Sequence, residues 1–270
     1  MFYTEEQTRD IQRIRFAYIR HNYQNYCLTI TLDRPEKKNA MNPLFMREIA
    51  FMLNHARHNE DVRVVVLKAN GNIFCAGADL KAMAGNSELP VSDVPEPLQE
   101  VKLGDAFIHL FKPCIAAVHA PVYAGGFLLL GGCTHVVSAS HAVFGLPEVN
   151  RGLWPFQVMA SLMPLIPSRV LLDWCMRGRV LNASEAFQVG LVSQVVEPEL
   201  RDKTVDLLSS ELAGKAPLAI RKGLEAIRNI QGSEQHAYLY EQLQVLLKSE
   251  DALEGLNAFA EKRAPRWKGK

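Results

Sequence analysis

Two short segments of small residues carry the strongest chemical signal in this sequence. Residues 74–80 read FCAGADL, and residues 124–127 read AGGF. An oxyanion hole needs bare backbone N–H groups aimed at one oxygen, so small residues recur where two such groups converge. A third segment, residues 144–148 (FGLPE), places the carboxylate of Glu148 on a turn between apolar stretches. Together the three segments indicate an enzyme that stabilises an enolate.

Strands and helices alternate around these segments. Four stretches with β-forming or continuous apolar residues read as strands: residues 26–32, 62–69, 115–118 and 135–139. Asn42 followed by Pro43 predicts the start of a helix that continues to residue 58, because asparagine caps helices and proline suits the first helical position. A second helix is predicted over residues 101–111. Short strands that alternate with turns and helices predict an α/β fold.

The last quarter of the chain reads almost entirely as helix. Four helices are predicted, over residues 201–214, 217–230, 233–247 and 250–262. We therefore divide the chain into an α/β core, residues 1–199, and a C-terminal helical region, residues 200–270. This region is a candidate lid or subunit interface, and the alternative is that it packs back on its own core. Residues 84–97 contain three prolines and few large apolar side chains, which predicts a mobile loop.

The bulk composition excludes several classes of protein. The 270 residues have a formal net charge of +1, so whole-molecule electrostatics favour neither nucleic-acid nor membrane binding. The five cysteines are scattered without C-x-x-C spacing, which favours reduced, mostly buried thiols over disulfides or a zinc site. The N-terminus lacks an apolar signal core, and no apolar run is long enough to span a bilayer. We expect a cytoplasmic protein.

The chain is identified as a member of the crotonase superfamily, the enoyl-CoA hydratase/isomerase group, from about Tyr26 to Trp267. The matching segments are residues 32–42 (LDRPEKKNAMN), 74–80, 112–118 (KPCIAAV), 144–149 (FGLPEV) and 183–196 (ASEAFQVGLVSQVV). The resemblance implies a crotonase-like spiral of repeated ββα units whose C-terminal helices build homotrimers, often paired into hexamers. It also implies an acyl-CoA thioester substrate. No G-x-G-x-x-G, Walker A, G-x-S-x-G or H-E-x-x-H pattern occurs, so we expect no metal and no cofactor beyond the CoA moiety of the substrate.

The resemblance assigns roles to three residues. The backbone amides of Ala78 and Gly125 would hold the thioester carbonyl oxygen as it becomes an enolate, each donor contributing about 3 kcal/mol in the transition state. Without the resemblance, the favoured interpretation of both stretches is tight turns that need small residues. Glu148 matches one of the two acid/base carboxylates of enoyl-CoA hydratases, and the alternative is a surface glutamate on a turn. Desolvation would suit Glu148 to catalysis by raising its pKa toward neutrality.

The second hydratase glutamate is missing from this sequence. Its position holds Leu128, and no acidic residue lies between residues 122 and 143. Hydration works best with two groups, whereas one carboxylate suffices to shuttle a proton along an allylic system. The pattern therefore favours a Δ3-Δ2-enoyl-CoA isomerase. Three alternatives stay open: a hydratase that positions water without this second glutamate, an acyl-CoA decarboxylase, and a CoA-binding protein without catalytic activity.

The resemblance also places the CoA moiety. The backbone around Lys37, Asn39 and Ala40 would border the adenine and pantetheine, and Ala76 would close the site. Lys262, together with Arg263, would reach the phosphates, from the same subunit or a neighbouring one. For each lysine, ordinary surface charge is the alternative.

Four further groups of residues have weaker signals. Asp79 is expected to cap the helix that follows it rather than to react. Trp154 and Phe156 either shape the acyl pocket or only pack. Tyr123 is a candidate hydroxyl donor near the thioester. His119, His135 and His141 lack metal-ligand spacing and are expected to be structural.

Overall fold

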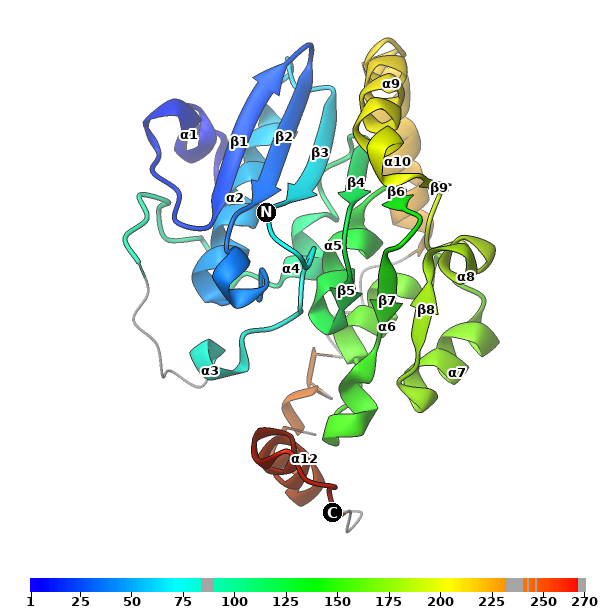
Figure 1. Cartoon of the computed structure of the whole chain (residues 1–270). Coiled ribbons are helices and arrows are strands. Elements are labelled where there is room, and N and C mark those ends of the chain that lie inside the picture. Colours follow the sequence, from blue (N-terminus) through cyan, green and yellow to red (C-terminus); the bar gives the residue numbers. More distant parts are fainter. Residues whose placement is uncertain (84–89, 232–239, 242, 246, 267–270) are drawn as a thin grey trace.

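The computed structural model describes residues 1–83, 90–231, 240, 241, 243–245 and 247–266, and its main sheet confirms the predicted α/β fold. This sheet has six strands in the order β1-β2-β3-β4-β6-β9 (Figure 1). Their bounds are β1 Ile19–Gln24, β2 Cys27–Leu32, β3 Val64–Ala69, β4 Cys114–Val118, β6 His135–Ala139 and β9 Gln194–Val196. The pair β1–β2 is antiparallel, and every other pair is parallel. The carboxyl ends of five neighbouring strands therefore meet at one edge of the sheet.

The four predicted strands are confirmed, with small changes at their ends. Strand β2 begins at Cys27, because Asn25 and Tyr26 both have positive φ and form the two-residue turn from β1. Strand β3 begins at Val64 rather than residue 62. Strand β1 was not predicted from the sequence, because its residues Ile19–Gln24 are mostly polar and lie on an exposed edge.

Helices cover both faces of the main sheet (Figure 1). Strand residues alternate between the two faces, so Val65 and Leu67 point into the larger core, whereas Val64 and Val66 point the other way. Helix α2 (Pro43–His58) belongs to the larger core, and α9 (Arg201–Ala213) packs on the opposite face through Val205 and Ala213. The predicted start of α2 is confirmed, because the side chain of Asn42 accepts a hydrogen bond of 2.8 Å from the amide of Phe45.

A second, three-stranded sheet lies beside the first. It comprises β5 Val122–Tyr123, β7 Val143–Gly145 and β8 Val180–Asn182, in the order β5-β7-β8. Shorter helices surround both sheets: α1 Glu5–Thr8, α3 Leu80–Met83, α4 Leu103–Ala106, α5 Phe127–Gly132, α6 Phe156–Leu162, α7 Ser168–Arg177 and α8 Ala183–Gln188. None of the second sheet's strands was predicted, since two or three residues give no readable alternation.

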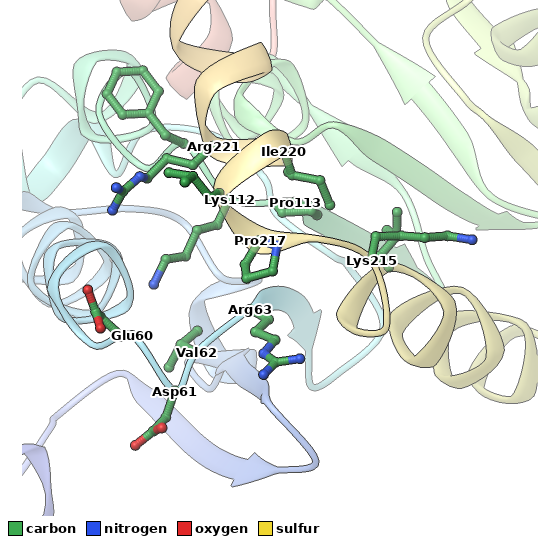
Figure 2. Close-up of a pocket in the computed structure, with 13 residues that line it drawn as sticks. Glu60, Asp61, Val62, Arg63, Lys112, Pro113, Lys215, Pro217, Ile220 and Arg221 are labelled. Atoms are coloured by element: carbon green, nitrogen blue, oxygen red, sulfur yellow. The ribbon is translucent and has the colours of Figure 1, made fainter.

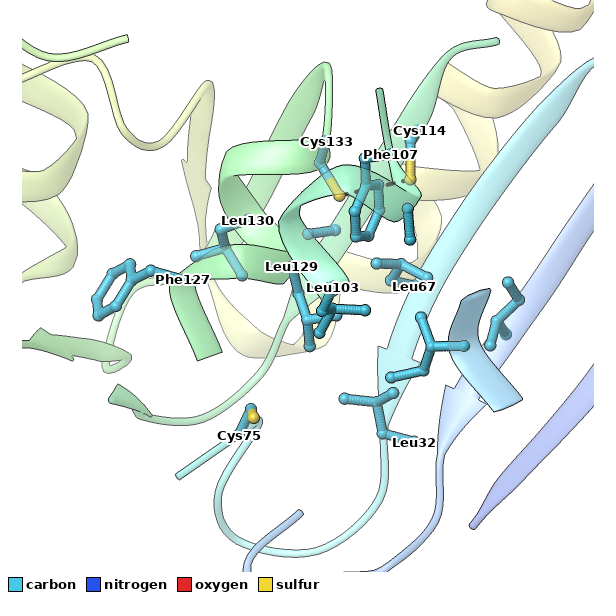
Figure 3. Packing of buried hydrophobic residues seen from close by; sticks show 14 of the residues in the cluster. Leu32, Leu67, Cys75, Leu103, Phe107, Cys114, Phe127, Leu129, Leu130 and Cys133 are labelled. Carbon is cyan, nitrogen blue, oxygen red and sulfur yellow. Dashed lines mark hydrogen bonds between the residues drawn. The ribbon is translucent and has the colours of Figure 1, made fainter. Parts of the chain in front are cut away.

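Helix α5 is buried against the large core because its glycines permit close contact (Figure 3). A Cβ on Gly132 would lie 2.1 Å from the ring of Phe107, and one on Gly131 would lie 2.8 Å from Ser161. Figure 3 shows Phe107 beside Cys114 and Cys133, whose sulfur atoms are 3.4 Å apart as free thiols. This packing fixes α5, whose preceding residues 124–126 belong to the candidate oxyanion hole.

The predicted helix over residues 101–111 is wrong in its extent. Only α4, Leu103–Ala106, is helical, and a series of turns follows it. Phe111 has φ of +48°, a conformation that no right-handed helix contains, and its ring stacks against the guanidinium of Arg57 at 4.9 Å. For the predicted loop over residues 84–97, residues 84–89 lie outside the described part, and 90–97 contain neither helix nor strand.

Three of the four predicted C-terminal helices are confirmed: α9, α10 Pro217–Gln231 and α12 Glu250–Glu261. Most of the fourth, residues 233–247, lies outside the described residues. Helix α12 packs back on the chain's own turn that carries Glu148. A Cβ on Gly255 would lie 2.1 Å from the carbonyl oxygen of Arg151, and the guanidinium of Arg151 lies 4.2 Å from the ring centre of Phe259. The division of the chain at residue 199 stays a prediction.

In the described ranges, no helix is both long and apolar enough to cross a membrane.

Candidate active site

A cavity of about 240 Å³ brings together four of the residues singled out in the sequence: Ala78, Gly125, Leu128 and Glu148. Ala78 follows β3, and Gly125 follows β5, which comes directly after β4 in the chain. Leu128 lies in the first turn of α5, and Glu148 follows β7. The wall is mostly apolar and includes Met41, Met46, Leu103, Leu153, Trp154, Phe156 and Val158. Such a cavity suits a small apolar group with a few polar groups to orient it.

Backbone pairing fixes the direction of the Ala78 amide. The carbonyl of Gly77 accepts a hydrogen bond from the Met41 amide (2.7 Å), and the amide of Asp79 donates to the Met41 carbonyl (2.9 Å). Since successive peptide groups of an extended chain point to opposite sides, the N–H of Ala78 points away from Met41. Among the described residues, no backbone carbonyl accepts from it outside regular helices and strands. The amide is therefore available to a ligand.

Gly125 lies directly opposite this amide. A Cβ built on Gly125 would be 3.4 Å from the nitrogen of Ala78, and one on Gly77 would be 2.9 Å from the nitrogen of Gly125. Gly125 belongs to the single 3₁₀ turn η3, Ala124–Gly126, whose first N–H groups have no partner within the turn. Ala124 has φ of +51°, a conformation unfavourable for alanine, which is typical of strain held at functional sites. The backbone of Gly125 therefore lies against the amide of Ala78, and the joint role of the two amides as an oxyanion hole stays a prediction.

The side chain of Asp79 holds the loop that contains Ala78, and its expected role as a helix cap is confirmed. Its Oδ1 accepts a hydrogen bond of 3.2 Å from the amide of Ala82 at the start of α3. Its Oδ2 forms a 2.8 Å ion pair with the buried guanidinium of Arg34. The same guanidinium donates to the carbonyl of Ala40 at 2.6 Å, so the ion pair ties together two of the loops around the cavity.

Glu148 contributes a carboxylate whose pKa suits acid/base chemistry near neutrality. Burial raises its pKa to about 7, against smaller lowering effects from its own backbone amide and from the charge of Arg151. Its Oε2 atom is buried and has no hydrogen-bond partner among the described residues. An unsatisfied buried oxygen is costly, and the cavity it borders offers space for a substrate group to satisfy it.

Arg151 is a residue that the sequence analysis missed. Glu148 and Arg151 lie three residues apart on the 3₁₀ turn η4, Pro147–Arg151, and side chains at this spacing eclipse one another. Both border the cavity. The i, i+3 spacing would have been a usable signal only if the 3₁₀ turn had been predicted.

Leu128 lines the cavity that Glu148 also lines, and it is half-buried. A second carboxylate does reach this wall from elsewhere: Glu100, which the sequence analysis did not single out. Glu100 is exposed, and its Oε1 accepts a hydrogen bond of 3.1 Å from the hydroxyl of Tyr240. Of the two alternatives for Trp154 and Phe156, the structure favours shaping the pocket, since both line it.

The residues expected around CoA divide into two groups. Ala76 lines the cavity, whereas Lys37, Asn39, Ala40 and Lys262 do not. The side chain of Asn39 is buried and holds its own loop, donating to the carbonyls of Asn70 (2.8 Å) and Ile73 (2.9 Å). Lys37 and Lys262 are exposed at turns. Contacts of these residues with CoA stay predictions.

The remaining candidates take structural positions. Arg263 is held in an ion pair with Glu254 at 2.6 Å. The ring of Tyr123 packs against Gly145, where a Cβ would lie 2.8 Å from it. His119 bonds the carbonyl oxygen of Gly71 at 2.7 Å. Within the part of the chain that the structure describes, no three His, Cys, Asp or Glu side chains gather as metal ligands.

The chain is similar to known proteins over most of its length. The family model described as enoyl-CoA hydratase/isomerase matches residues 22–270. A carnitinyl-CoA dehydratase from Salmonella typhi is 37% identical over 252 residues, spanning 90% of this chain and 95% of the relative. The carnitinyl-CoA dehydratase from Escherichia coli K12 is 38% identical over 253 residues, with the same two coverages.

Solved structures give the same result. The crystal structure of carnitinyl-CoA hydratase from Mycobacterium avium superposes with a TM-score of 0.82 at 30% identity, covering 94% of this chain and 99% of that one. An enoyl-CoA hydratase/isomerase from Pseudoalteromonas atlantica T6c gives a TM-score of 0.83 at 28% identity, covering 93% and 100%. The crotonase-like fold expected from the sequence is therefore confirmed.

Proposed function

The chain belongs to the enoyl-CoA hydratase/isomerase family of acyl-CoA enzymes, and from that premise we propose that it isomerises Δ3-enoyl-CoA to Δ2-enoyl-CoA. Glu148 would be the single proton carrier. The observation that carries the proposal is the pairing of a buried glutamate, whose pKa lies at about 7, with an apolar residue, Leu128, at the position of the second hydratase glutamate. A trimeric assembly, which the superfamily resemblance implies, stays a prediction.

The proposed reaction needs no atom beyond substrate and enzyme. The carbonyl oxygen of the thioester accepts hydrogen bonds from the amides of Ala78 and Gly125. Ionised Glu148 removes a proton from C2, and the electron pair delocalises into the carbonyl to give a dienolate. The protonated carboxyl then returns the proton to C4, which leaves the double bond between C2 and C3. A pKa near neutrality suits this step because the same group must accept and then donate a proton.

A second candidate function is hydration or dehydration of an acyl-CoA. The relatives named carnitinyl-CoA dehydratase favour it, and Glu100 is a second carboxylate on the cavity wall. Glu100 is less suited than Glu148 to acid/base work because it is exposed and already accepts a hydrogen bond from Tyr240. We therefore rank this reaction below isomerisation.

Product analysis distinguishes the two reactions. With a 3-enoyl-CoA thioester, we expect the double bond to migrate without a change in the mass of the substrate. Chromatography and mass spectrometry of the products measure both. With a 2-enoyl-CoA thioester, we expect the wild-type protein to add no water to the substrate. The Leu128→Glu variant should add one water molecule to it. Water addition by the wild-type protein, lost in Glu100→Gln, would instead support the second candidate function.

Removing the charge of Arg151 should shift the pH dependence of the reaction. Arg151 lowers the pKa of Glu148, so Arg151→Gln should raise that pKa further. Because kcat/KM requires ionised Glu148 in the free enzyme, activity falls as pH drops through about 7 in the wild type, and we expect it to fall at a higher pH in the variant. Arg169→Gln, an exposed position of equal charge, is the control. An unchanged midpoint of the pH profile would show that Arg151 does not act on the catalytic carboxyl.

A further inference from the structure

A cavity with a basic lining lies where β3 and β4 begin (Figure 2). This is the opposite edge of the main sheet from the thioester site. Its volume is about 480 Å³. Val62 and Arg63 lead into β3, Lys112 and Pro113 lead into β4, and the start of α10 closes the third side. The thioester site is built on loops that follow the carboxyl ends of these same strands. Since β3 has six residues, about 20 Å of strand separates the two edges.

Positive charge dominates the wall of this cavity. Four cationic side chains line it, Arg63, Lys112, Lys215 and Arg221, against two carboxylates, Glu60 and Asp61. Both carboxylates are exposed, whereas Arg63, Lys112 and Arg221 are half-buried. The deeper part of the cavity is therefore positive, although the whole chain is nearly neutral at +1.

Three of the cations at this site repel one another. Lys112 and Arg221 come from different elements, and Arg57 stacks on the ring of Phe111, a lining residue, at 4.9 Å. Burial, and then the charges of Arg57 and Arg221, lower the pKa of Lys112 to about 8. Among the described residues, no carboxylate forms an ion pair with any of the three. Carboxylates lie near enough to attract these cations without forming an ion pair: Glu225 acts on Arg57 and Arg221, and Glu60 and Asp61 act on Lys112. After burial, repulsion from the neighbouring cations still affects the pKa of Lys112 and of Arg57 more than this attraction does, and a bound anion would reduce its cost.

A purely structural role accounts for part of this cluster. The ammonium of Lys112 donates a 2.7 Å hydrogen bond to the carbonyl of Asn59 at the C-terminal end of α2, where a positive charge is stabilising. That bond uses one of the three donors of the ammonium and leaves two. It does not explain Arg221, which enters the same cavity from α10.

We propose that this cavity is a second ligand site, which binds a phosphate group between Arg221 and Lys112. A guanidinium presents paired N–H donors that match phosphate oxygens, and an ammonium adds a point charge. The phosphate is either the free anion or a phosphate ester of a nucleotide-like molecule, and its chemistry at the site is the same. The inference is independent of the reaction at Glu148.

Thermal unfolding and calorimetric titration test this site. Wild type, Arg221→Gln, Arg221→Lys and Lys222→Gln are compared in inorganic phosphate and in adenosine 3′,5′-bisphosphate, with chloride at equal ionic strength as the reference. Lys222 is the matched control because it is the next residue of α10, is exposed, and pairs with Glu225. Each titration is repeated with butanoyl-CoA present, so that binding at the thioester site is separated from binding here.

We expect phosphate to raise the Tm of the wild type and of Lys222→Gln, because a ligand of the native state stabilises it. Arg221→Gln should bind phosphate at least about tenfold more weakly, Arg221→Lys should retain part of the affinity, and butanoyl-CoA should leave the effect unchanged. In chloride, the Tm of Arg221→Gln should not fall below that of the wild type, since loss of the Arg221 charge relieves its repulsion with Lys112 and Arg57. If the bisphosphate binds more tightly than inorganic phosphate, the ligand of the site is a phosphate ester. If the two bind equally, the ligand is the free anion. Equal stabilisation of all four proteins, or of none, would overturn the proposal.

Discussion

Replacing Glu148 by glutamine should lower kcat/KM for the acyl-CoA substrate by about 10³- to 10⁴-fold, the upper part of the range for general acid–base catalysis. Glutamine keeps the shape of the side chain but cannot exchange a proton. The loss of kcat/KM should lie near the upper end of this range, because both proton transfers of the proposed reaction go through this one carboxyl. The measurement is a steady-state rate with the thioester that the product analysis identifies.

The same substitution should stabilise the fold above neutral pH, which separates a catalytic loss from unfolding. The folded-state pKa of Glu148 is about 7, above the value of an unfolded glutamate near 4.3, so the folded state binds the proton more tightly. Stability therefore falls as pH rises from about 4.3 to 7, and a neutral glutamine escapes this loss. We expect Glu148→Gln to be more stable than the wild type at pH 8 by about 1–3 kcal/mol.

Glu199→Gln is the matched control, since Glu199 is an exposed glutamate on another short 3₁₀ turn. It should change neither the rate nor the stability measurably. If Glu148→Gln turned over an acyl-CoA as fast as the wild type, Glu148 would have no catalytic role and the proposed proton shuttle would be wrong. A wild-type protein that turned over no acyl-CoA would instead favour a CoA-binding protein without catalysis.

The candidate site was predictable where its chemistry is local in sequence. The loops with Ala78 and Gly125 could be recognised because each matches a short segment of the family, and the small residues alone would have fitted tight turns as well. The two loops come together because they follow parallel strands that end side by side. The departure at Leu128 was equally local, because it is one position within a recognisable segment.

The contributions of Arg151 and Glu100 could not be predicted in the same way. Arg151 shares the cavity with Glu148 only because residues 147–151 form a 3₁₀ turn, and the proline at its start suits a loop equally well. Glu100 reaches the cavity from a stretch with no regular structure before α4. Their positions depend on tertiary packing, which leaves no periodic pattern in the sequence.

The wrong helix over residues 101–111 has the same physical origin. Its apolar residues Leu103, Phe107 and Leu110 do recur at helical spacing, and all three are buried. They are buried, however, by a short helix followed by turns, and the close contact between Phe107 and Gly132 fixes that path. The helical spacing of these apolar residues correctly predicted that they are buried. The backbone conformation, however, depends on packing against α5.

Adding one methyl group at Gly125 should reduce activity nearly as strongly as loss of an oxyanion-hole donor, which costs about 10²- to 10³-fold in kcat. A Cβ at Gly125 would lie 3.4 Å from the nitrogen of Ala78 and 3.5 Å from the Cα of Gly77, both ordinary van der Waals distances. The fold should therefore accept alanine, but the methyl group would occupy the space between the two amides where the thioester oxygen has to sit. Measurements of kcat/KM and of Tm on Gly125→Ala test this directly.

Gly223→Ala is the control for the same chemical change, because a Cβ there meets no atom within 4 Å on the exposed side of α10. Alanine in a helix should stabilise the protein by about 0.5–1 kcal/mol and leave the rate unchanged. A Gly125→Ala protein that unfolds near the wild-type Tm and yet has lost most of its activity would place the reacting oxygen between the amides of residues 78 and 125. Full activity in that variant would mean that the oxygen binds elsewhere, and the proposed enolate mechanism would then lack its stabilising site.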